Sequence, residues 1–422
     1  MAQFTHTRLI IVVTGANGGV GFGVCHRLLV QLSERNPPDA TPRFDIKPGC
    51  GQGEIEYDAS AAGVTIILAC RDLKRAEDAR AALYGLLDAH IASLPEHSVA
   101  REYALEFRKK VQLETHKLDL SETRSVLQFG REVSQKYPYI SHLICNAGVA
   151  KYSHLDFPKF FRQCFESPTG AIHHPAFNIQ KTGTMSTDGL GYVWQCNVFG
   201  HYALFRSIQP LLSKYSSKSS TPARVLWTTS IDVLPAYNPA DDWQLTKTDA
   251  SYQASKFQLD LMSRELARRS SEDDGKVVHV LVSPGITATK MAAELLRPVI
   301  LEWLMLLFFY FCRLLGSPHV LFSTYKAAIA ASNLTLLPIE HIPRHIDGGA
   351  FPKFSAQNDR WGTESIGVEA VTEWEDHPGE GKEIIDRCER LYKAFVGAEC
   401  KTNGVGNGVN GVNGINGASV HS

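Results

Sequence analysis

The chain has 422 residues, 44% of them hydrophobic and 9% aromatic, which is enough to bury a sizeable core. Its 43 basic and 44 acidic side chains give a formal net charge of −1 and exclude the basic surface of a nucleic-acid-binding protein. The 9 cysteines and 16 histidines show neither Cys-x-x-Cys pairs nor metal-ligand spacing, so we expect reduced thiols and no metal site.

Strand and helix patterns alternate along the chain, and residues 1–8 are too short and polar for a secretory signal. Near-continuous apolar runs indicate strands that are buried on both faces. The alternation predicts an α/β fold with a doubly wound parallel sheet, in one domain over residues 1–345. The predicted strands lie at residues 9–13, 64–70, 111–118, 142–145, 224–229 and 277–282.

A glycine-rich turn, Thr14-Gly-Ala-Asn-Gly-Gly-Val-Gly21, separates the first strand from a helix. This arrangement presents free backbone N–H groups and a positive helix end to a pyrophosphate. Gly15 permits the tight turn, Gly19 lets the backbone approach the phosphates, and Gly21 lets the helix pack on the strand. The predicted phosphate-binding residues are Gly15, Asn17, Gly19, Val20 and Gly21.

Tyr252 and Lys256 lie four positions apart and therefore share one face of a helix. A phenol titrates near pH ~10, and a neighbouring cation favours the phenolate and lowers that pKa. Alone, this spacing usually means a half-buried aromatic ring covered by a lysine stem. Beside a nucleotide-binding turn, the pair becomes a candidate acid/base device.

Several motifs in one order resemble the short-chain dehydrogenase/reductases over about residues 8 to 335. Within that superfamily, the chain is similar to the fungal 3-ketosteroid (3-oxo-sterol) reductases of sterol C-4 demethylation, because of an apolar run at 301–318 and enlarged loops. The resemblance implies an NADP-binding Rossmann domain. The motifs are Thr14-Gly-x-x-x-Gly-x-Gly21, Asn146-Ala-Gly148, Asn197, Ser230, Tyr252-x-x-x-Lys256 and Pro284-Gly285.

The resemblance assigns catalytic roles to four residues. Tyr252 gives a proton to the carbonyl oxygen of the substrate, and Lys256 lowers the phenol pKa and holds the nicotinamide ribose. Ser230 donates a hydrogen bond to the oxyanion that develops on this oxygen. Asn197 distorts its helix and anchors a water path to Lys256. Reduction by hydride from NADPH is the expected reaction.

The end of the second strand, Cys70-Arg71-Asp72, favours NADP over NAD. Cys70 occupies the position where NAD-selective relatives carry an acidic residue, and the Arg71 guanidinium suits a 2′-phosphate. The alternative is that Arg71 only pairs with Asp72 on the surface. Of the two threonines after the last strand we slightly prefer Thr287. The remaining expected cofactor contacts are Asp119 at the adenine, Asn146, Tyr252, Lys256, Pro284, Gly285, Thr287 and Thr289.

The most apolar stretch, residues 298–315, approaches the ~20 residues that a bilayer span requires, but it contains Glu302 and Arg313. It is either an internal lid or dimer helix, or a monotopic membrane attachment, which we favour, with Trp303 and Tyr310 at the interface. Such an attachment could receive a sterol directly from the bilayer. The expected location is the cytosolic face of the endoplasmic reticulum membrane, or a lipid droplet. Polar substitution of Phe308, Phe309 and Phe311 would then release the protein from the membrane.

Insertions are expected at about residues 36–62 and 152–190, with an apolar lid or membrane segment at 295–316. The second insertion either helps to enclose substrate or is a surface elaboration. A C-terminal extension follows over 346–400, with a short helix at 381–395. The Asn/Gly-rich tail at 401–422 cannot bury enough surface to fold and is expected to be disordered.

The favoured function is NADPH-dependent reduction of a 3-oxo-sterol to its 3β-hydroxyl in ergosterol-type sterol biosynthesis. One alternative is a paralogue that acts on another lipophilic carbonyl or alcohol, such as a retinoid or a triterpenoid. Another is a non-enzymatic NADP-binding scaffold, which would tolerate loss of the four catalytic residues. The resemblance also implies a homodimer through the helices that bear Asn197 and Tyr252, and a complex with other sterol C-4 demethylation enzymes.

Overall fold

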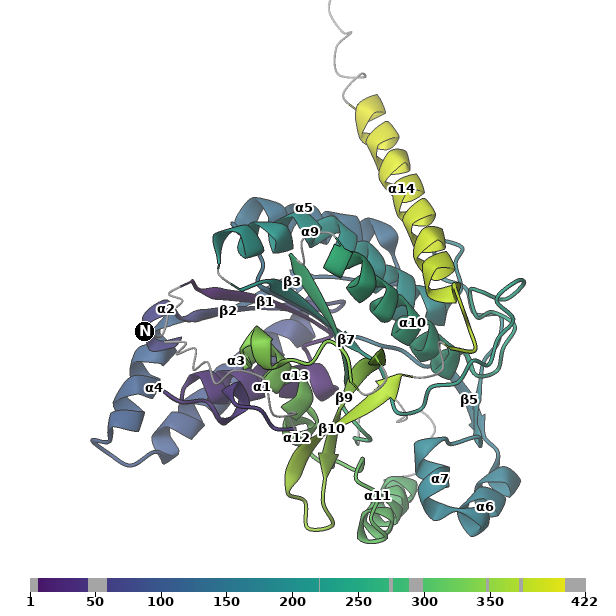
Figure 1. Ribbon diagram of the computed structural model, residues 1–422, viewed down its shortest axis with the longest axis horizontal. Helices are drawn as coiled ribbons and strands as arrows, with labels where there is room; N and C mark the ends of the chain where they lie inside the picture. The colour runs from purple at the N-terminus through teal and green to yellow at the C-terminus, as the bar shows by residue number, and fades with distance from the viewer. Residues whose placement is uncertain are drawn as a thin grey trace, which may run out of the picture.

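The computed structural model describes residues 7–44, 59–219, 221–272, 276–287, 299–346, 349–371 and 375–406. Its centre is an 8-stranded sheet in the order β10-β9-β8-β7-β4-β1-β2-β3, in which only β10 is antiparallel to its neighbour (Figure 1). All six predicted strands are confirmed, each to within one residue at either end. The strands are β1 (Leu9–Thr14), β2 (Val64–Cys70), β3 (Val111–Lys117), β4 (His142–Cys145), β7 (Ala223–Thr228), β8 (Val277–Ser283), β9 (Phe351–Asn358) and β10 (Glu364–Val371).

Helices cover both faces of the sheet, as the doubly wound fold requires (Figure 1). On one face lie α5 (Thr123–Lys136), α9 (Gly200–Lys218) and α10 (Ser251–Glu272). The other face carries α1 (Gly19–Leu32), α3 (Leu73–Ser93), α12 (Thr324–Ala327) and α13 (Ile329–Leu336), and α4 (Val99–Lys110) packs beside α3. The carboxyl ends of the parallel strands meet at one edge, which is where ligands bind in such folds.

Strands β9 and β10 were not predicted. β9 runs parallel to β8 through three residue pairs, Leu281 with Lys353, Val282 with Phe354 and Ser283 with Ser355. The sheet therefore continues past residue 345, where we placed the end of the catalytic domain. The Arg27 side chain of α1, which is 1% exposed, pairs with both Asp39 and Glu364 of β10 and ties this added hairpin to α1.

The insertion at residues 152–190 projects from the carboxyl edge of the sheet (Figure 1). It contains a two-stranded antiparallel sheet of β5 (Tyr152–Leu155) and β6 (Asn178–Gln180). Between these strands lie α6 (Phe157–Glu166) and α7 (Pro168–His173). The side chains of Asp156 and Ser167 accept backbone hydrogen bonds at the first turns of α6 and α7, which explains where both helices begin. Of the first insertion, the structure describes a 3₁₀ turn, Pro38–Ala40, and α2 (Ala59–Ala62), and residues 45–58 lie outside the described part.

The C-terminal helix α14 (Glu380–Gly406) is longer than the helix predicted at 381–395 and continues past residue 401, where the predicted tail begins. Ile385 and Cys388 are 2% and 0% exposed against the body of the protein. Glu389 accepts hydrogen bonds from Arg206 at 2.8 Å and from Tyr202 at 2.7 Å, and these contacts hold the pKa of Glu389 at about 2. Because α14 packs on α5, α9 and α10, the dimer expected through α9 and α10 would have to form around it.

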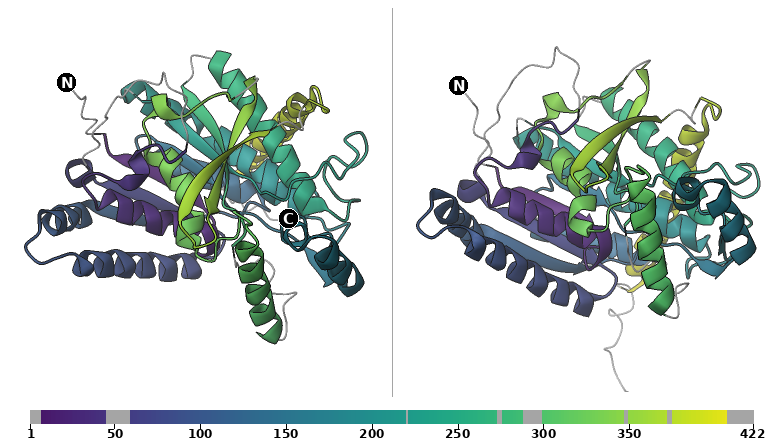
Figure 2. Two further views of the ribbon diagram at one scale, coloured as in Figure 1. Left: turned by 60° about the horizontal axis from the view of Figure 1, so that its bottom comes forward. Right: turned by 90° about the horizontal axis from the view of Figure 1, so that it is seen from below.

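Helix α11 (Val299–Leu314) and the α6–α7 pair protrude from the same edge of the molecule (Figure 2). The rings of Phe160 and Phe308 meet with centroids 6.1 Å apart, and the Cys312 thiol donates to the Pro168 carbonyl at 3.5 Å. In the parts of the chain that the structure describes, we find no helix with the length and apolar character to cross a membrane.

Candidate active site

Tyr252 and Lys256 lie in the first turns of α10, on one face as predicted. The Lys256 ammonium is 5.7 Å from the centroid of the Tyr252 ring. Lys256 is 4% exposed, and its Nζ donates a hydrogen bond of 2.8 Å to the Thr228 carbonyl at the end of β7. The lysine therefore joins α10 to the central sheet.

The predicted lowering of the Tyr252 pKa is wrong for this structure. Burial raises the pKa of Tyr252 to about 12, a hydrogen bond with Ser230 lowers it, and the charge of Asp232 raises it further. Burial also lowers the pKa of Lys256 to about 8, against the opposing influence of Asp260 and Cys145. Both shifts follow from loss of hydration, which disfavours the charged form of either group. The phenol is therefore protonated at neutral pH.

Ser230 follows β7. Its side chain lies close enough to form a hydrogen bond with Tyr252, and this bond lowers the pKa of the phenol. The Ser230 hydroxyl oxygen also accepts a hydrogen bond of 3.0 Å from the backbone N–H of Asp232. Two hydroxyls from different elements thus converge at the carboxyl edge of the sheet, where a carbonyl oxygen could accept from both.

Asn197 lies in a π-helical segment, Gln195–Phe199, at the start of α9. This distortion is the one expected for the residue that bends its helix. Asn197 is fully buried, with Oδ1 accepting from the Val149 N–H at 2.8 Å and Nδ2 donating to the Ser255 hydroxyl at 2.9 Å. A Cβ atom built on Gly148 would lie 3.6 Å from Asn197 Oδ1 and 3.7 Å from Lys256 Nζ, so these groups flank the same glycine.

A groove of about 260 Å³ runs from the glycine-rich turn past the ends of β2 and β3. Of the residues predicted to bind cofactor, Gly15, Asn17, Arg71 and Asp119 line it. Arg75 also lines the groove and was not predicted. Nucleotide phosphates bind where backbone N–H groups and guanidinium groups converge. The groove therefore offers two guanidinium groups at the end of β2, where the ribose 2′-phosphate of NADP would be held.

The glycines of the turn are required by its shape. Gly15 and Gly19 have positive φ angles of 67° and 53°, which side chains disfavour. A Cβ atom on Gly21 would lie 2.5 Å from Asn146 Nδ2 and 2.7 Å from the Gly15 carbonyl oxygen, so no side chain fits there. Asn146 Nδ2 donates to the Thr14 carbonyl at 3.0 Å and braces β1 against β4, and Val20 lies in the first turn of α1.

The alternative pairing of Arg71 with Asp72 is not observed among the described residues. The Asp72 carboxylate caps α3 by accepting from the Arg75 N–H at 3.1 Å, and Arg71 approaches the Tyr192 hydroxyl at 3.5 Å. The buried Cys70 thiol lies under the turn, where backbone N–H groups of the turn donate to it, and burial raises its pKa to about 11. The position of an acidic ribose ligand is thus filled by a neutral thiol.

The loop after β8 lies beside the same edge. Gly285, which follows Pro284, has a φ of 67°, and the Ile286 N–H donates to the His319 carbonyl at 2.7 Å. Among the residues that the structure describes, none forms a hydrogen bond with the buried Thr287 hydroxyl, so it is free to serve a bound cofactor. Thr289 lies outside the described residues. The groove and this hydroxyl fit a dinucleotide.

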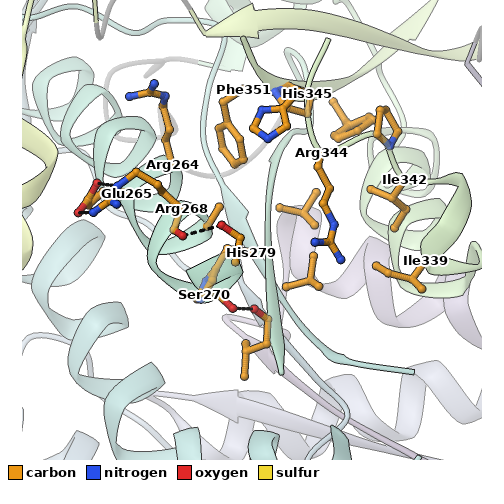
Figure 3. A pocket seen from close by; sticks show the side chains of 18 of the residues that line it. Arg264, Glu265, Arg268, Ser270, His279, Ile339, Ile342, Arg344, His345 and Phe351 are labelled. Carbon is orange, nitrogen blue, oxygen red and sulfur yellow. Dashed lines mark hydrogen bonds and ion pairs between the residues drawn. The ribbon is translucent and has the colours of Figure 1, made fainter. Parts of the chain in front are cut away.

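A second cavity of about 220 Å³ lies between α10, β8 and residues 339–354 (Figure 3). It reaches Val277 at the amino-terminal end of β8, away from the edge that carries the catalytic residues. Arginines such as Arg268 line it, but Arg268 already pairs with Glu265 at 2.8 Å and Glu272 at 2.6 Å. This cavity contains none of the predicted site residues, so we assign the chemistry to the carboxyl edge.

The insertion directly contacts the residues expected to be catalytic, and these contacts were not predicted from the sequence. Gln180 of β6 accepts a hydrogen bond of 2.8 Å from the backbone N–H of Tyr252. His174 lies 3.2 Å from the Asp232 carboxylate. The Tyr152 pKa is raised by burial and then by Tyr252 and Asp232, so this second phenol faces the same polar centre. Of the two interpretations of the insertion, these contacts favour a part in the active site.

The chain was compared with known proteins to find which of them it is similar to. No family model matches the chain. It is 27% identical to the 3-keto-steroid reductase of Kluyveromyces lactis over 91% of this chain and 92% of that enzyme. It is 29% identical to the Schizosaccharomyces pombe 3-keto-steroid reductase over 76% of this chain and 81% of that enzyme.

Among solved structures, the NADP complex of Pseudomonas aeruginosa RhlG superposes with a TM-score of 0.46 at 15% identity, over 78% of this chain and 90% of that chain. The 3-keto-steroid reductase of Eremothecium gossypii is 31% identical over 62% of this chain and 70% of that enzyme. The chain therefore belongs to the family of fungal 3-keto-steroid reductases.

Proposed function

We propose that this protein reduces a 3-oxo-sterol to the 3β-hydroxysterol with NADPH, in the C-4 demethylation stage of sterol biosynthesis. The observation that carries the proposal is the meeting of Ser230, Tyr252 and Lys256 beside a groove with two arginines. Relatives named 3-keto-steroid reductase share most of the chain and supply the substrate class. The groove at Arg71 and Arg75 supports NADPH as the cofactor.

When bound, NADPH supplies the hydride. Tyr252, whose pKa is held at about 12, keeps its proton until the carbonyl oxygen of the substrate becomes basic, and then donates it. The Ser230 hydroxyl hydrogen-bonds the same oxygen and stabilises its growing negative charge. The Lys256 ammonium, 5.7 Å from the ring, stabilises the phenolate that remains. Solvent then returns a proton to Tyr252.

Purified protein incubated with NADPH and a 4-methyl-3-oxo-sterol is expected to yield the 3β-hydroxysterol, measured by mass spectrometry. Retinal and a triterpenoid ketone serve as competing substrates at matched concentrations. A higher kcat/KM for retinal or for the triterpenoid ketone would instead support the alternative that this protein is a paralogue acting on another lipophilic carbonyl. Binding of NADPH without turnover of any carbonyl would indicate the scaffold alternative instead.

We also propose that the enzyme attaches to one leaflet of the endoplasmic reticulum membrane through an apolar surface that we call the platform. Large apolar side chains at this edge are unusually exposed, with Phe165 at 93%, Trp361 at 84% and Trp303 at 70%. Contiguous exposed apolar surface of this kind marks an interaction site. The platform consists of Phe157, Phe161 and Phe165 of α6, Trp303, Leu304, Leu307, Tyr310, Phe311, Leu314 and Leu315 in and after α11, and Trp361 of the β9–β10 turn.

One face of α11 packs inward, so not every residue of this helix can be used to test the attachment. Phe308 and Phe309, two of the three residues we expected to face lipid, pack against a small buried cluster of Ile172, Cys312 and Val320. Polar substitution there would loosen α11 rather than report on membrane contact. Phe311, at 50% exposure, remains a suitable probe.

Replacing Phe161, Trp303 and Phe311 with serine is expected to release the protein from phospholipid vesicles in a flotation assay. Burial of each such side chain contributes roughly 1.5–3 kcal/mol, so the partition coefficient should fall by at least about tenfold for each one removed. Turnover of detergent-dispersed substrate should persist. Leu105→Ser, an exposed leucine on the distant α4, is the control and should still float. Full vesicle binding by the triple variant would contradict the attachment, and conversion of a dimer to a monomer would show that a second copy covers the platform.

A further inference from the structure

Three cationic side chains meet at the border of the platform, where α11 ends beside the β9–β10 turn (Figure 1). A Cβ atom built on Gly362 of this turn would lie 3.4 and 3.5 Å from the terminal nitrogens of Arg313, in the last turn of α11. The Lys326 ammonium of α12 donates to the carbonyl of the same glycine at 2.6 Å. A Cβ atom on Gly316, just after α11, would lie 3.5 Å from Arg360. Cations from three elements therefore converge around one turn.

None of the three cations has a carboxylate partner among the residues that the structure describes. Asp359, which precedes Arg360, serves the turn itself, because its Oδ1 accepts from the backbone N–H groups of Trp361 and Thr363 at 2.9 and 2.8 Å. The Nε of Arg313 is buried and forms no hydrogen bond with any described residue. Like charges that lie close together repel one another, so an anion bound between them would stabilise all three.

The packing of Arg313 explains one cation at this place, but not three. Its guanidinium lies over the rings of Tyr310 and Phe322, 5.3 Å from each centroid, and the two rings stack 4.0 Å apart. A cation in the last turn of a helix also compensates the negative end of the helix dipole. Neither the stacked rings nor the end of α11 accounts for Arg360 or Lys326. Their convergence on the same turn therefore favours an anionic ligand.

The surroundings of the three cations indicate that this anion belongs to a lipid. Trp361, which is 84% exposed, directly follows Arg360, and Leu314 and Leu315, at 58% and 50%, directly follow Arg313. The cations thus lie where the apolar platform ends, as basic residues do in helices that lie at a membrane interface. Guanidinium groups match the oxygens of a phosphate, and basic residues at a membrane surface attract anionic headgroups.

We propose that Arg313, Arg360 and Lys326 form a headgroup site that binds the phosphate of an anionic phospholipid. The guanidinium N–H groups and the lysine ammonium donate to the phosphate oxygens, and the acyl chains lie against the platform. Because the three cations belong to α11, to the β9–β10 turn and to α12, one headgroup fixes how these elements meet the membrane. The inference rests on the proposed membrane attachment and adds the class of lipid to it.

The test measures flotation of the full chain with phosphatidylcholine vesicles and with vesicles that also contain phosphatidic acid. The wild type is expected to bind both and to prefer phosphatidic acid, as measured by the ratio of the two partition coefficients. A basic residue at an anionic membrane surface strengthens binding by about fivefold, so Arg360→Gln and Lys326→Gln should each lower this ratio by about that factor. Binding to phosphatidylcholine alone should not change, because the platform is intact. Arg313 is left in place, because its loss would also loosen α11.

Arg162→Gln is the matched control, because it removes the same charge from the same membrane-facing edge. Arg162 of α6 is 75% exposed but already has a carboxylate partner, Glu166, at 3.7 Å. The Arg162→Gln variant should therefore keep the wild-type preference for phosphatidic acid to within about twofold. Equal losses in Arg162→Gln and Arg360→Gln would show attraction to surface charge in general and would overturn the headgroup site. Turnover of detergent-dispersed ketone confirms that each variant is folded. If Lys326→Gln fails this check, the exposed Arg360 decides.

The remaining outcomes separate the headgroup site from the attachment on which it rests. A wild type that binds both vesicles equally would overturn the headgroup site and leave the attachment intact. A wild type that binds neither would refute the attachment and the headgroup site together. Calorimetric titration with glycerol phosphate, without vesicles, tests for a soluble ligand, and no binding at these cations is expected. Binding that is lost in the double variant Arg360→Gln with Lys326→Gln would assign the cations to a soluble phosphate ester and overturn the lipid assignment.

Discussion

Tyr252→Phe is expected to lower kcat for ketone reduction by about 10²- to 10⁴-fold, the range typical for loss of a positioned proton donor. The phenylalanine ring keeps its packing beside Lys256 and loses only the hydroxyl. Cofactor affinity should change by no more than a few fold, because the groove at Arg71 and Asp119 is untouched. Steady-state oxidation of NADPH with the sterol ketone measures kcat, and fluorescence titration measures cofactor affinity.

Tyr152→Phe is the matched control for this prediction. Tyr152 is a second phenol near the Asp232 carboxylate, and burial likewise raises its pKa. It lies in the insertion, where no hydrogen bond to Ser230 influences it, and its loss should cost little activity. If Tyr152→Phe were inactive and Tyr252→Phe active, the proton donor would be Tyr152 and the motif-based assignment would fail.

Most of the strands that sequence analysis located are buried along nearly their whole length, and β3, which includes exposed residues, is the exception. Residues 64–70 of β2 are buried throughout, so an unbroken apolar run describes them well. β9 is also buried, but it contains Pro352 and Lys353. β10 is half-exposed or exposed except at Ile366 and Val371. β9 pairs with β8, and β10 pairs with β9. This pairing stabilises both strands at the edge of the sheet although their intrinsic strand propensity is low, and it is visible only in the folded chain.

The same contrast explains which parts of the site could be predicted. Tyr252 and Lys256 carry a local spacing that a helix turns into proximity. His174, Gln180 and Asp232 carry no local pattern, and their side chains contact residues that lie 21 to 73 positions away in the chain. The direction of the Tyr252 pKa shift was wrong for a related reason. Loss of hydration depends on packing from every side, and the sequence identified only the one neighbouring cation.

Helix α6, part of the platform, has a periodic sequence pattern that lies inside an insertion. Phe157, Phe161 and Phe165 recur every four residues and share one face of α6, a periodicity that predicts an amphipathic helix. Sequence analysis predicts this segment only as an insertion and assigns no helix to it, so the pattern was not used. For α11 the apolar character was recognised, but a helix that is apolar on all sides gives no sign of which face packs inward.

The double variant Arg71→Ala with Arg75→Ala is expected to abolish the preference for NADPH over NADH. A charge-assisted hydrogen bond contributes about 1.5–3 kcal/mol, so each lost arginine should raise the KM for NADPH by roughly 10- to 100-fold. The KM for NADH, which has no 2′-phosphate, should change by no more than a few fold. The ratio of kcat/KM for the two cofactors measures the outcome.

Because of where the two arginines lie, the double variant tests cofactor binding in the groove rather than the overall positive charge of the protein. Asp72 is committed to capping α3, so neither arginine is neutralised by it through an observed ion pair. Arg80→Ala is the control, because Arg80 lies further along the same helix, pairs with Glu77 and does not line the groove. Equal losses with NADPH and NADH in the double variant would place the guanidinium groups away from the 2′-phosphate. A selective loss with Arg75→Ala but not Arg71→Ala would move the discriminating contact one turn into α3, since Arg75 reaches the same groove from the helix rather than from the strand end.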